Sequence, residues 1–387
     1  MKILFIHCWQ TGNTGDNAIW ESMISHLKSA FPDSTLTICS QRIEKWDMDQ
    51  LSEVTMTKVI PMELVREIDR REFNNLHTND DIKGYLQSKV GSATKELKEA
   101  DIVMSQGGGY MNGDWMWAEL SYIYIAQHLG KPTFYGSQTF IGGVREQTKR
   151  LAKIVFDNAD LVVAREKESL KFITEYIGAE GSQIKLLPDG VFTVRAKTYI
   201  NPIPQNAVKI GIRGYLTTPE LLKEIAKFAD MAVETLGPVV FIPVSNGERN
   251  DAKQAKEIAE MMKHESIVVD NKPDAGELLD ILKDGILISD RYHGIVYSAS
   301  VCTPFVPLTP DIGRKMPGLL KMIDYPFDKI LSTKTTNAEE IFEYATAIWK
   351  RKEEIRKHLE KTIPEVKRKA ELAYKYIIEG IKKYGFS

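Results

Sequence analysis

Residues 286–308, ILISDRYHGIVYSASVCTPFVPL, decide the fold class of this chain. The apolar run at 285–289 predicts a short buried strand. The small and apolar residues 295–301 predict a helix, which Thr303 and Pro304 end, and residues 305–308 predict the next strand. Strand, helix and strand in this order form the repeating unit of a parallel α/β sheet.

Between this strand and its helix lies the sequence Asp-Arg-Tyr-His-Gly, residues 290–294. Ligands of open α/β sheets bind outside the carboxyl ends of the strands. Arg291 and His293, placed there at a helix N-terminus, predict an anion site with a titratable group beside it. The alternative is that both are ordinary surface or capping residues. The sharp turn at Gly294 and the lack of apolar periodicity around His293 favour the functional interpretation.

A second series of strands and helices surrounds this stretch. We expect strands at residues 209–214, 239–244, 266–270, 285–289 and 305–308, and helices near 218–236, 250–263, 275–284 and 294–302. The first of these strands places Arg213 at the same carboxyl edge as Arg291. Arg314 and Lys315 follow the last strand.

The chain begins with a strand over residues 2–8, a glycine-rich loop at 10–17 and a helix over 18–30. Such a loop can hold a phosphate or a sugar hydroxyl through Asn13, Asp16 and backbone N–H groups. It matches neither a P-loop nor G-x-G-x-x-G, so it indicates no particular nucleotide. The alternative is a tight turn with Asp16 as the helix N-cap.

The rest of the first half continues the alternation. We expect strands at residues 34–40, 100–106, 132–137, 160–164 and 184–187, and helices near 115–129, 144–158 and 167–177. Residues 41–100 are charged and irregular in pattern, with helical pieces near 62–76 and 80–99. Strand ends carry Arg165, Asp189 and the turn formed by Gly107, Gly108 and Gly109, where a ligand can approach the main chain. The aromatic residues of helix 115–129 are expected in the core, although Tyr110 and Trp115 could stack on a sugar ring.

The chain of 387 residues is long enough for two domains. We expect an N-terminal Rossmann-like domain at 1–194, a proline-containing linker at 195–207, and a second Rossmann-like domain at 208–335. Residues 336–387 are expected to be helices, interrupted near Pro364, that pack back on the domains. Their basic residues indicate a solvated face, with contact to an anionic membrane surface as the alternative.

Composition limits the classes of partner and the compartment. A net charge of −2 argues against nucleic acid as the main partner. Three cysteines without paired spacing indicate a reducing compartment, and the initial apolar run is too short for a signal peptide. We therefore expect a cytoplasmic protein. Whether it works at the inner face of the membrane, and whether it forms a homo-oligomer, both stay open.

The ordered motifs resemble those of the polysaccharide pyruvyl transferase family. They are Gly-Asn-Thr-Gly-Asp at 12–16, Gly-Gly-Gly at 107–109, Ala-Arg-Glu at 164–166, Leu-Pro-Asp at 187–189 and Ser-x-Arg-x-His-Gly from Ser289. The resemblance implies a GT-B-like fold, in which two Rossmann-like parallel-sheet domains face each other across a cleft. It also implies transfer of pyruvate from phosphoenolpyruvate to a sugar of a polysaccharide or lipid-linked precursor, as a ketal. The second domain would then serve phosphoenolpyruvate and the first the acceptor.

This chemistry agrees with the residue types. Phosphoenolpyruvate carries a carboxylate and a phosphate, so its site needs several cations. Arg165, Arg213 and Arg291, with Arg314 or Lys315, are candidates to supply them. His293 is the candidate general acid. The sequence shows no metal-ligand spacing, so we expect no metal and no cofactor beyond the donor substrate.

Two other functions compete with this one. A GT-B glycosyltransferase using a nucleotide sugar would need an acidic residue for the ribose after the signature turn, and none lies between Arg291 and Pro304. A non-catalytic sugar- or phosphate-binding protein on a transferase scaffold is the third possibility. The Arg-x-His pair argues against it.

Overall fold

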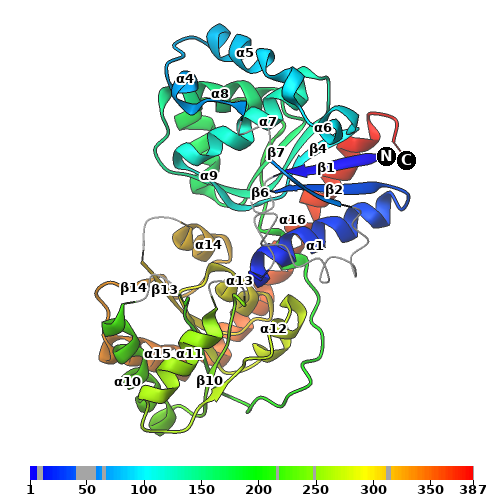
Figure 1. Cartoon of the computed structure of the whole chain (residues 1–387). Helices are drawn as coiled ribbons and strands as arrows, with labels where there is room; N and C mark the ends of the chain where they lie inside the picture. Colours follow the sequence, from blue (N-terminus) through cyan, green and yellow to red (C-terminus); the bar gives the residue numbers. More distant parts are fainter. Residues whose placement is uncertain are drawn as a thin grey trace. The chain divides into compact units, whose positions relative to one another are not determined.

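The computed structural model describes residues 1–6, 12–40, 58–62, 67–214, 218–246, 250–310 and 315–386. Contacts divide the chain into two compact units (Figure 1). The first unit contains Met1–Thr11, Ile19–Gly190 and Lys369–Ser387, and the second contains Gly12–Ala18 and Val191–Arg368. The short segment Gly12–Ala18 therefore belongs to the second unit although its neighbours in the sequence belong to the first.

The first unit is built on a parallel sheet with the order β3-β2-β1-β4-β6-β7-β8, in which β5 also pairs with β6. Its strands are β1 (Lys2–Ile6), β2 (Thr35–Ser40), β3 (Lys58–Pro61), β4 (Ile102–Ser105), β5 (Gly108–Asn112), β6 (Thr133–Ile141), β7 (Leu161–Ala164) and β8 (Ile184–Leu186). Strands β4 and β7 are buried throughout, as expected for a parallel sheet covered on both faces.

The larger helices of the first unit follow the predicted alternation. They are α1 (Thr14–Ala30), α7 (Met116–His128) and α8 (Glu146–Asp157), with the short α9 (Lys167–Lys171). Residues Met116 to Ala126 of α7 are all buried, which confirms that its aromatic residues belong to the core. Trp115 lies just before this helix and is exposed.

The helical pieces predicted near 62–76 and 80–99 correspond to short helices. Among the described residues of this stretch, α4 (Arg70–Asn74), α5 (Asn79–Ser88) and α6 (Lys95–Glu99) follow the strand β3, which was not predicted. Each helix has its own N-cap, whose side chain accepts a backbone hydrogen bond: Asp69, Thr78 and Thr94. These capping side chains fix where each short helix begins.

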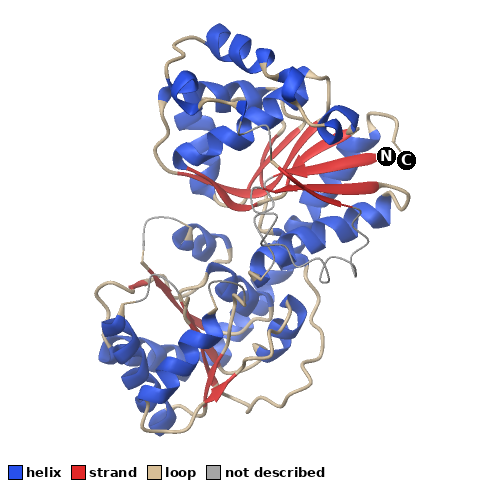
Figure 2. Cartoon of the chain, in the orientation of Figure 1, coloured by secondary structure: helices blue, strands red, loops and turns tan. Residues whose placement is uncertain are grey.

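The second unit has a parallel sheet with the order β11-β10-β9-β12-β13-β14. Its strands are β9 (Val208–Gly211), β10 (Val239–Phe241), β11 (Ile267–Val268), β12 (Ile286–Ser289), β13 (Phe305–Thr309) and β14 (Leu331–Ser332). Its helices are α10 (Pro219–Thr235), α11 (Asp251–Met261), α12 (Ala275–Ile281), α13 (Tyr292–Ser300), α14 (Met316–Met322) and α15 (Ala338–Lys350). Strand β9, the first of this sheet in the sequence, lies inside the sheet, which is the doubly wound arrangement. The predicted class of two parallel-sheet α/β domains is therefore confirmed (Figure 2).

The last helix, α16 (Lys352–Lys382), runs through Pro364 without a break, so the predicted interruption is wrong. Its buried side chains recur every three or four residues: Ile355, Leu359, Ile363, Val366, Ala370, Ala373, Ile377 and Ile381. This apolar stripe binds the helix to the protein on both sides of the proline and offsets the missing backbone donor. The chain is instead interrupted at Arg351, between α15 and α16.

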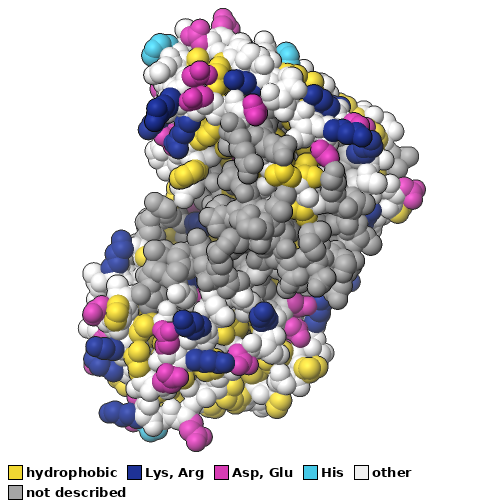
Figure 3. Space-filling model, viewed as in Figure 1, with side chains coloured by type: hydrophobic (Ala, Val, Ile, Leu, Met, Phe, Trp, Pro, Cys, Tyr) yellow, Lys and Arg dark blue, Asp and Glu magenta, His cyan; other side chains and the backbone are white. Residues whose placement is uncertain are grey.

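Basic and acidic residues are nearly equal in number in the sequence, and both kinds occur on the surface (Figure 3). Basic and acidic side chains are interspersed among the described residues on the face shown in Figure 3. No helix within the described residues has the length and apolar character needed to cross a membrane.

Replacing Pro364 by Ala should raise the free energy of unfolding by about 1–3 kcal/mol, because the helix regains a backbone donor and loses a steric clash. Chemical denaturation followed by circular dichroism measures the change. Pro219→Ala is the matched control. Pro219 is the first residue of α10, where a proline costs little, so this change should leave stability nearly unaltered. Destabilisation by Pro364→Ala would contradict this explanation.

Candidate active site

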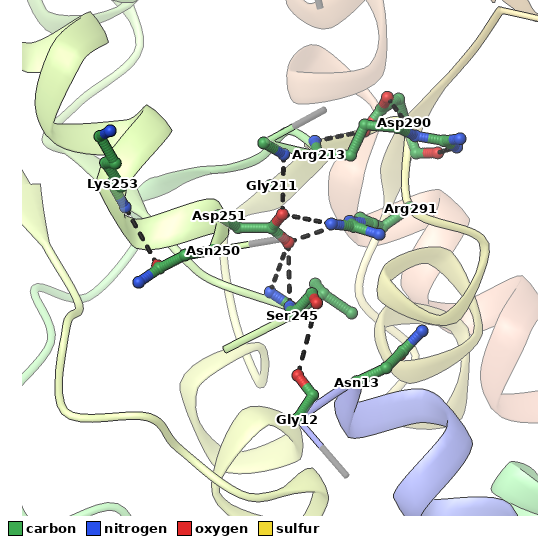
Figure 4. A network of polar contacts seen from close by, with 12 residues as sticks. Gly12, Asn13, Gly211, Arg213, Ser245, Asn250, Asp251, Lys253, Asp290 and Arg291 are labelled. Atoms are coloured by element: carbon green, nitrogen blue, oxygen red, sulfur yellow. Dashed lines mark hydrogen bonds and ion pairs between the residues drawn. The ribbon is translucent and has the colours of Figure 1, made fainter. Parts of the chain in front are cut away.

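The carboxyl edge of the second sheet is organised by the carboxylate of Asp251, the first residue of α11 (Figure 4). This side chain is 1% exposed. It accepts hydrogen bonds from the backbone N–H groups of Gly214 at 2.9 Å, Val244 at 3.1 Å and Ser245 at 2.9 Å. One buried carboxylate thus holds together the segments that follow β9 and β10.

Arg291 is the fourth partner of this carboxylate. Its Nε donates to Asp251 Oδ2 at 2.9 Å, and its Nη2 contacts Oδ1, which makes the pair bidentate. Burial raises the pKa of the Asp251 carboxyl, and the positive charge of Arg291 acts in the opposite direction. Arg291 lies at the carboxyl end of β12, as predicted. Its partner Asp251 was not predicted.

Arg213 forms a second pair at the same edge. Its backbone N–H donates to Asp290 Oδ1 at 2.8 Å, its Nε lies 2.7 Å from Oδ2, and its Nη2 donates to the backbone oxygen of Asp290 at 2.5 Å. Asp290 and Arg291 are neighbours in the sequence. Asp290 is ion-paired with Arg213 after β9, and Arg291 with Asp251 at the start of α11.

The turn between β12 and α13 is fixed by Ser289. Its hydroxyl donates to the backbone oxygen of Gly211 at 2.5 Å and accepts from the backbone N–H of Arg291 at 3.1 Å. A Cβ atom at Gly294 would lie 3.0 Å from this hydroxyl oxygen, closer than side chains normally pack. Packing against Ser289 thus accounts for glycine at position 294.

The glycine-rich loop near the N-terminus is part of this edge. Asn13 forms an antiparallel bridge with Ser245, with hydrogen bonds from Thr14 N to Val244 O at 3.1 Å and from Asn246 N to Gly12 O at 2.6 Å. Asn13 Oδ1 accepts from the backbone N–H of Gly15 at 3.1 Å, so Asn13 caps helix α1. The alternative of Asp16 as N-cap is wrong, because the helix begins at Thr14 and Asp16 lies buried in its first turn.

His293 lies in the first turn of α13, against this loop. A Cβ atom at Gly15 would lie 1.9 Å from the Nδ1 of His293, so the imidazole rests directly on the Gly15 backbone. The ring of Tyr292 meets the imidazole edge-on at 5.4 Å, and the Nζ of Lys315 lies 5.8 Å from the centre of the Tyr292 ring. Arg314 is outside the described residues.

The first unit holds the other predicted arginine. Arg165 and Asp189 are fully buried, and Arg165 Nη1 lies 2.5 Å from Asp189 Oδ2. The Nε of Arg165 donates to Thr139 Oγ1 at 2.7 Å and lies 3.4 Å from a carboxylate oxygen of Glu166. The structure thus brings Arg165 and Asp189 together at the carboxyl edge of the first sheet.

The three glycines at 107–109 do not form a simple turn. Gly108 and Gly109 begin strand β5, which pairs with the second half of β6. Gly107 and Gly108 have φ angles of +111° and +115°, which only glycine adopts readily. A Cβ atom at Gly107 would lie 3.0 Å from the backbone oxygen of Ser137. Close packing on β6 therefore explains Gly107, whereas a Cβ atom at Gly108 would lie 2.8 Å from the ring of Tyr110 in β5 itself.

A buried polar group that the sequence did not indicate lies beside these glycines. Ser105 Oγ contacts the carboxylate of Glu119, and the side-chain amide of Gln138 contacts the same hydroxyl. All three residues are fully buried. Glu119 belongs to the aromatic helix α7, where neither spacing nor composition marks a single glutamate as special.

These motifs extend over most of the chain, and the family model for polysaccharide pyruvyl transferases matches residues 13–312. This chain belongs to the polysaccharide pyruvyl transferase family. The match begins at Asn13 and includes the Arg-x-His turn. A comparison with curated proteins found no match.

Solved structures share the fold at low sequence identity. UDP-GlcNAc 2-epimerase from Neisseria meningitidis bound to UDP-GlcNAc is 13% identical with a TM-score of 0.62, over 99% of this chain and 100% of that chain. A glycosyltransferase from Rickettsia africae is 13% identical with a TM-score of 0.59, over 99% and 98%. MurG from Acinetobacter baumannii is 14% identical with a TM-score of 0.57, over 99% and 100%. These similarities establish the fold that this chain shares with glycosyltransferases and UDP-GlcNAc 2-epimerases.

The Asp251→Asn variant should lower the free energy of unfolding by about 3–5 kcal/mol, because it leaves a buried guanidinium without its counter-charge. Urea denaturation measures the loss. Asp270→Asn is the matched control, since the ion pair of Asp270 with Lys256 at 2.8 Å is exposed and should contribute little. Equal stability of the two variants would show that Asp251 does not hold this edge together.

Proposed function

We propose that this pyruvyl transferase family member moves the pyruvyl group of phosphoenolpyruvate onto two hydroxyls of a sugar. The acceptor is a polysaccharide or a lipid-linked precursor, the product is a cyclic ketal, and phosphate is released. The main support is that two family motifs distant in the sequence, Gly12–Asp16 and Ser289–Gly294, meet around His293 within the second unit.

Donor binding is assigned to the carboxyl edge of the second unit. Phosphoenolpyruvate offers two anionic groups, and guanidinium groups suit both because they donate paired hydrogen bonds. A guanidinium has five N–H donors, so the bidentate contact of Arg291 with Asp251 is compatible with binding an anion as well. Arg213, Arg314 and Lys315 complete the proposed cationic set, while Arg165 and Asp189 are assigned to the acceptor side in the first unit.

His293 is assigned as the general acid. The imidazolium gives its proton to the methylene carbon of the enol, which leaves an oxocarbenium-like carbon for the first sugar hydroxyl to attack. The neutral imidazole then takes back the proton of that hydroxyl. The second hydroxyl displaces phosphate, which leaves with the proton of that hydroxyl, so the histidine ends the cycle in its starting state. No step is assigned to a metal or a cofactor.

The surroundings of His293 support this assignment. The imidazole is half-buried on Gly15, and Ser289, Arg291 and Asp251 fix the turn from which it projects. A general acid works best when its direction is set before the substrate arrives. Arg291, two residues before His293, provides that constraint through its buried ion pair.

A nucleotide-sugar glycosyltransferase is the competing function, since the fold is shared with an epimerase solved with UDP-GlcNAc bound. The family match and the absence of an acidic residue between Arg291 and Pro304 favour pyruvyl transfer. Thermal-shift measurements with phosphoenolpyruvate, UDP sugars and GDP sugars separate the two. Stabilisation by a nucleotide sugar alone would support the glycosyltransferase.

The His293→Ala variant should lower turnover on the order of 10²–10⁴-fold while phosphoenolpyruvate still binds, because only the proton donor is lost. Phosphate release in the presence of an acceptor library, with mass spectrometry of the pyruvylated product, measures turnover. His264→Ala is the matched control, since His264 lies in the same unit and pairs with Glu234 at 2.9 Å. Full activity of His293→Ala would remove this residue from the mechanism.

The Gly15→Ala variant tests the contact beneath the imidazole. The new methyl group would displace the His293 ring, and a misplaced catalytic group should reduce turnover about a hundredfold. Helix α1 should remain folded, since alanine suits its first turn. Gly84→Ala serves as control because a Cβ atom at Gly84 of helix α5 meets nothing within 4 Å. Normal kinetics of Gly15→Ala would show that the position of His293 is not critical.

A further inference from the structure

Trp115 is a large apolar side chain that the proposed mechanism does not use. It closes the short helical turn Gly113–Trp115 after strand β5, and 72% of its surface is exposed. The next tryptophan in the sequence, Trp117, is only 7% exposed. Isolated exposed apolar residues are common on protein surfaces, so exposure alone does not indicate a role.

The surroundings of Trp115 distinguish it from an incidental surface residue. The guanidinium of Arg70 lies over its ring, 5.6 Å from the ring centre, and 6.0 Å from the centre of the Trp117 ring. Asp114 lies 3.8 Å from Arg70, and 2.9 Å from Arg145, whose backbone N–H also donates to it at 2.7 Å. Arg70 therefore lies over one face of the indole, while most of the side chain remains exposed. The Arg70 contact restrains the ring before a ligand binds, so ordering the ring on binding costs little further conformational entropy.

The strand pairing shows where Trp115 lies along the first sheet. Strand β4 pairs with the first half of β6, from Val103 with Thr133 to Ser105 with Tyr135. Strand β5 pairs with the second half, from Gly108 with Gln138 to Asn112 with Ile141. The end of β4 pairs with Tyr135 and the end of β5 with Ile141, so at about 3.3 Å per residue β5 carries the chain roughly 20 Å beyond the end of β4. Trp115 thus stands past the edge at which Gln138 and Arg165 lie.

We propose that Trp115, Arg70, Asp114 and Arg145 form a subsite for a pyranose ring of the acceptor glycan, away from the sugar that receives the pyruvyl group. The C–H face of a pyranose is apolar and stacks on an aromatic plane, while its hydroxyl rim matches guanidinium donors and a carboxylate acceptor. This subsite rests on the proposed function. A polymeric acceptor extends over several sugars and can reach it, whereas a single sugar bound at the reacting position does not.

Binding can be measured without any reaction. The full-length protein is run through native gels that contain a glucan, a mannan, a galactan or partially acetylated chitosan. We expect at least one polymer to retard the wild-type protein. Trp115→Ala should raise the apparent dissociation constant for that polymer at least about tenfold, because it removes a central aromatic contact. Trp115→Phe should restore part of it. Trp349→Ala is the matched control, because Trp349 also carries a cation, the Nζ of Lys352, at 3.9 Å from its ring centre.

The kinetics provide a second readout where turnover is found. Trp115→Ala should raise KM for the polymer at least about tenfold, and leave kcat and the KM for phosphoenolpyruvate unchanged. KM for a monosaccharide acceptor should not change either. A fall in kcat with both acceptors would contradict a remote subsite.

The outcomes separate this inference from the proposed function. Polymer retardation that depends on Trp115, in a protein that never consumes phosphoenolpyruvate, supports the subsite and rejects the reaction. Consumption of phosphoenolpyruvate with no Trp115-dependent retardation rejects the subsite and keeps the reaction. If none of the four polymers retards the wild-type protein, or if Trp115→Ala instead abolishes self-association in sedimentation and leaves retardation intact, the subsite is rejected.

Discussion

The second unit depends on one buried carboxylate. Asp251 binds the guanidinium of Arg291 and three backbone N–H groups, and so joins the segments that follow β9, β10 and β12. A charge buried this deeply is tolerated only with its partners in place. The three segments therefore cannot move independently. The same constraint acts on the N-terminal motif at 12–16, because Val244 and Ser245 also hold Gly12 to Thr14.

The sequence was sufficient for the fold class because apolar strands and amphipathic helices alternate along both halves. It failed where local signals compete with tertiary packing. Pro364 indicates a helix end, yet the buried stripe of α16 keeps the helix intact across it. The glycines at 107–109 indicate a turn, yet Gly108 and Gly109 begin strand β5, which pairs with β6. Both errors come from contacts that sequence periodicity does not contain.

For the candidate site, the sequence predicted the positions of the arginines but not their ion pairs. Arg165, Arg213 and Arg291 lie at strand ends because their strands are apolar runs whose limits can be read directly. Asp251, 40 residues from Arg291, was not predicted at all, whereas Asp189, 24 residues from Arg165, was predicted as a strand-end residue but not as its ion-pair partner. The pairing changes the electrostatics of the edge. Each arginine is ion-paired with an aspartate, and the pair fixes the direction of the remaining guanidinium donors.

The meeting of Gly15 with His293 explains why family motifs separated by most of the chain can belong to one chemical unit. Asn13 caps helix α1 and pairs with Ser245, and this places Gly15 beneath the imidazole. Any larger residue at position 15 would occupy the space of the ring. The N-terminal motif is therefore a structural component of the second unit's edge, although the strand before it belongs to the first unit. A loop that sets the position of a candidate general acid is under steric constraint whether or not it contacts a ligand itself.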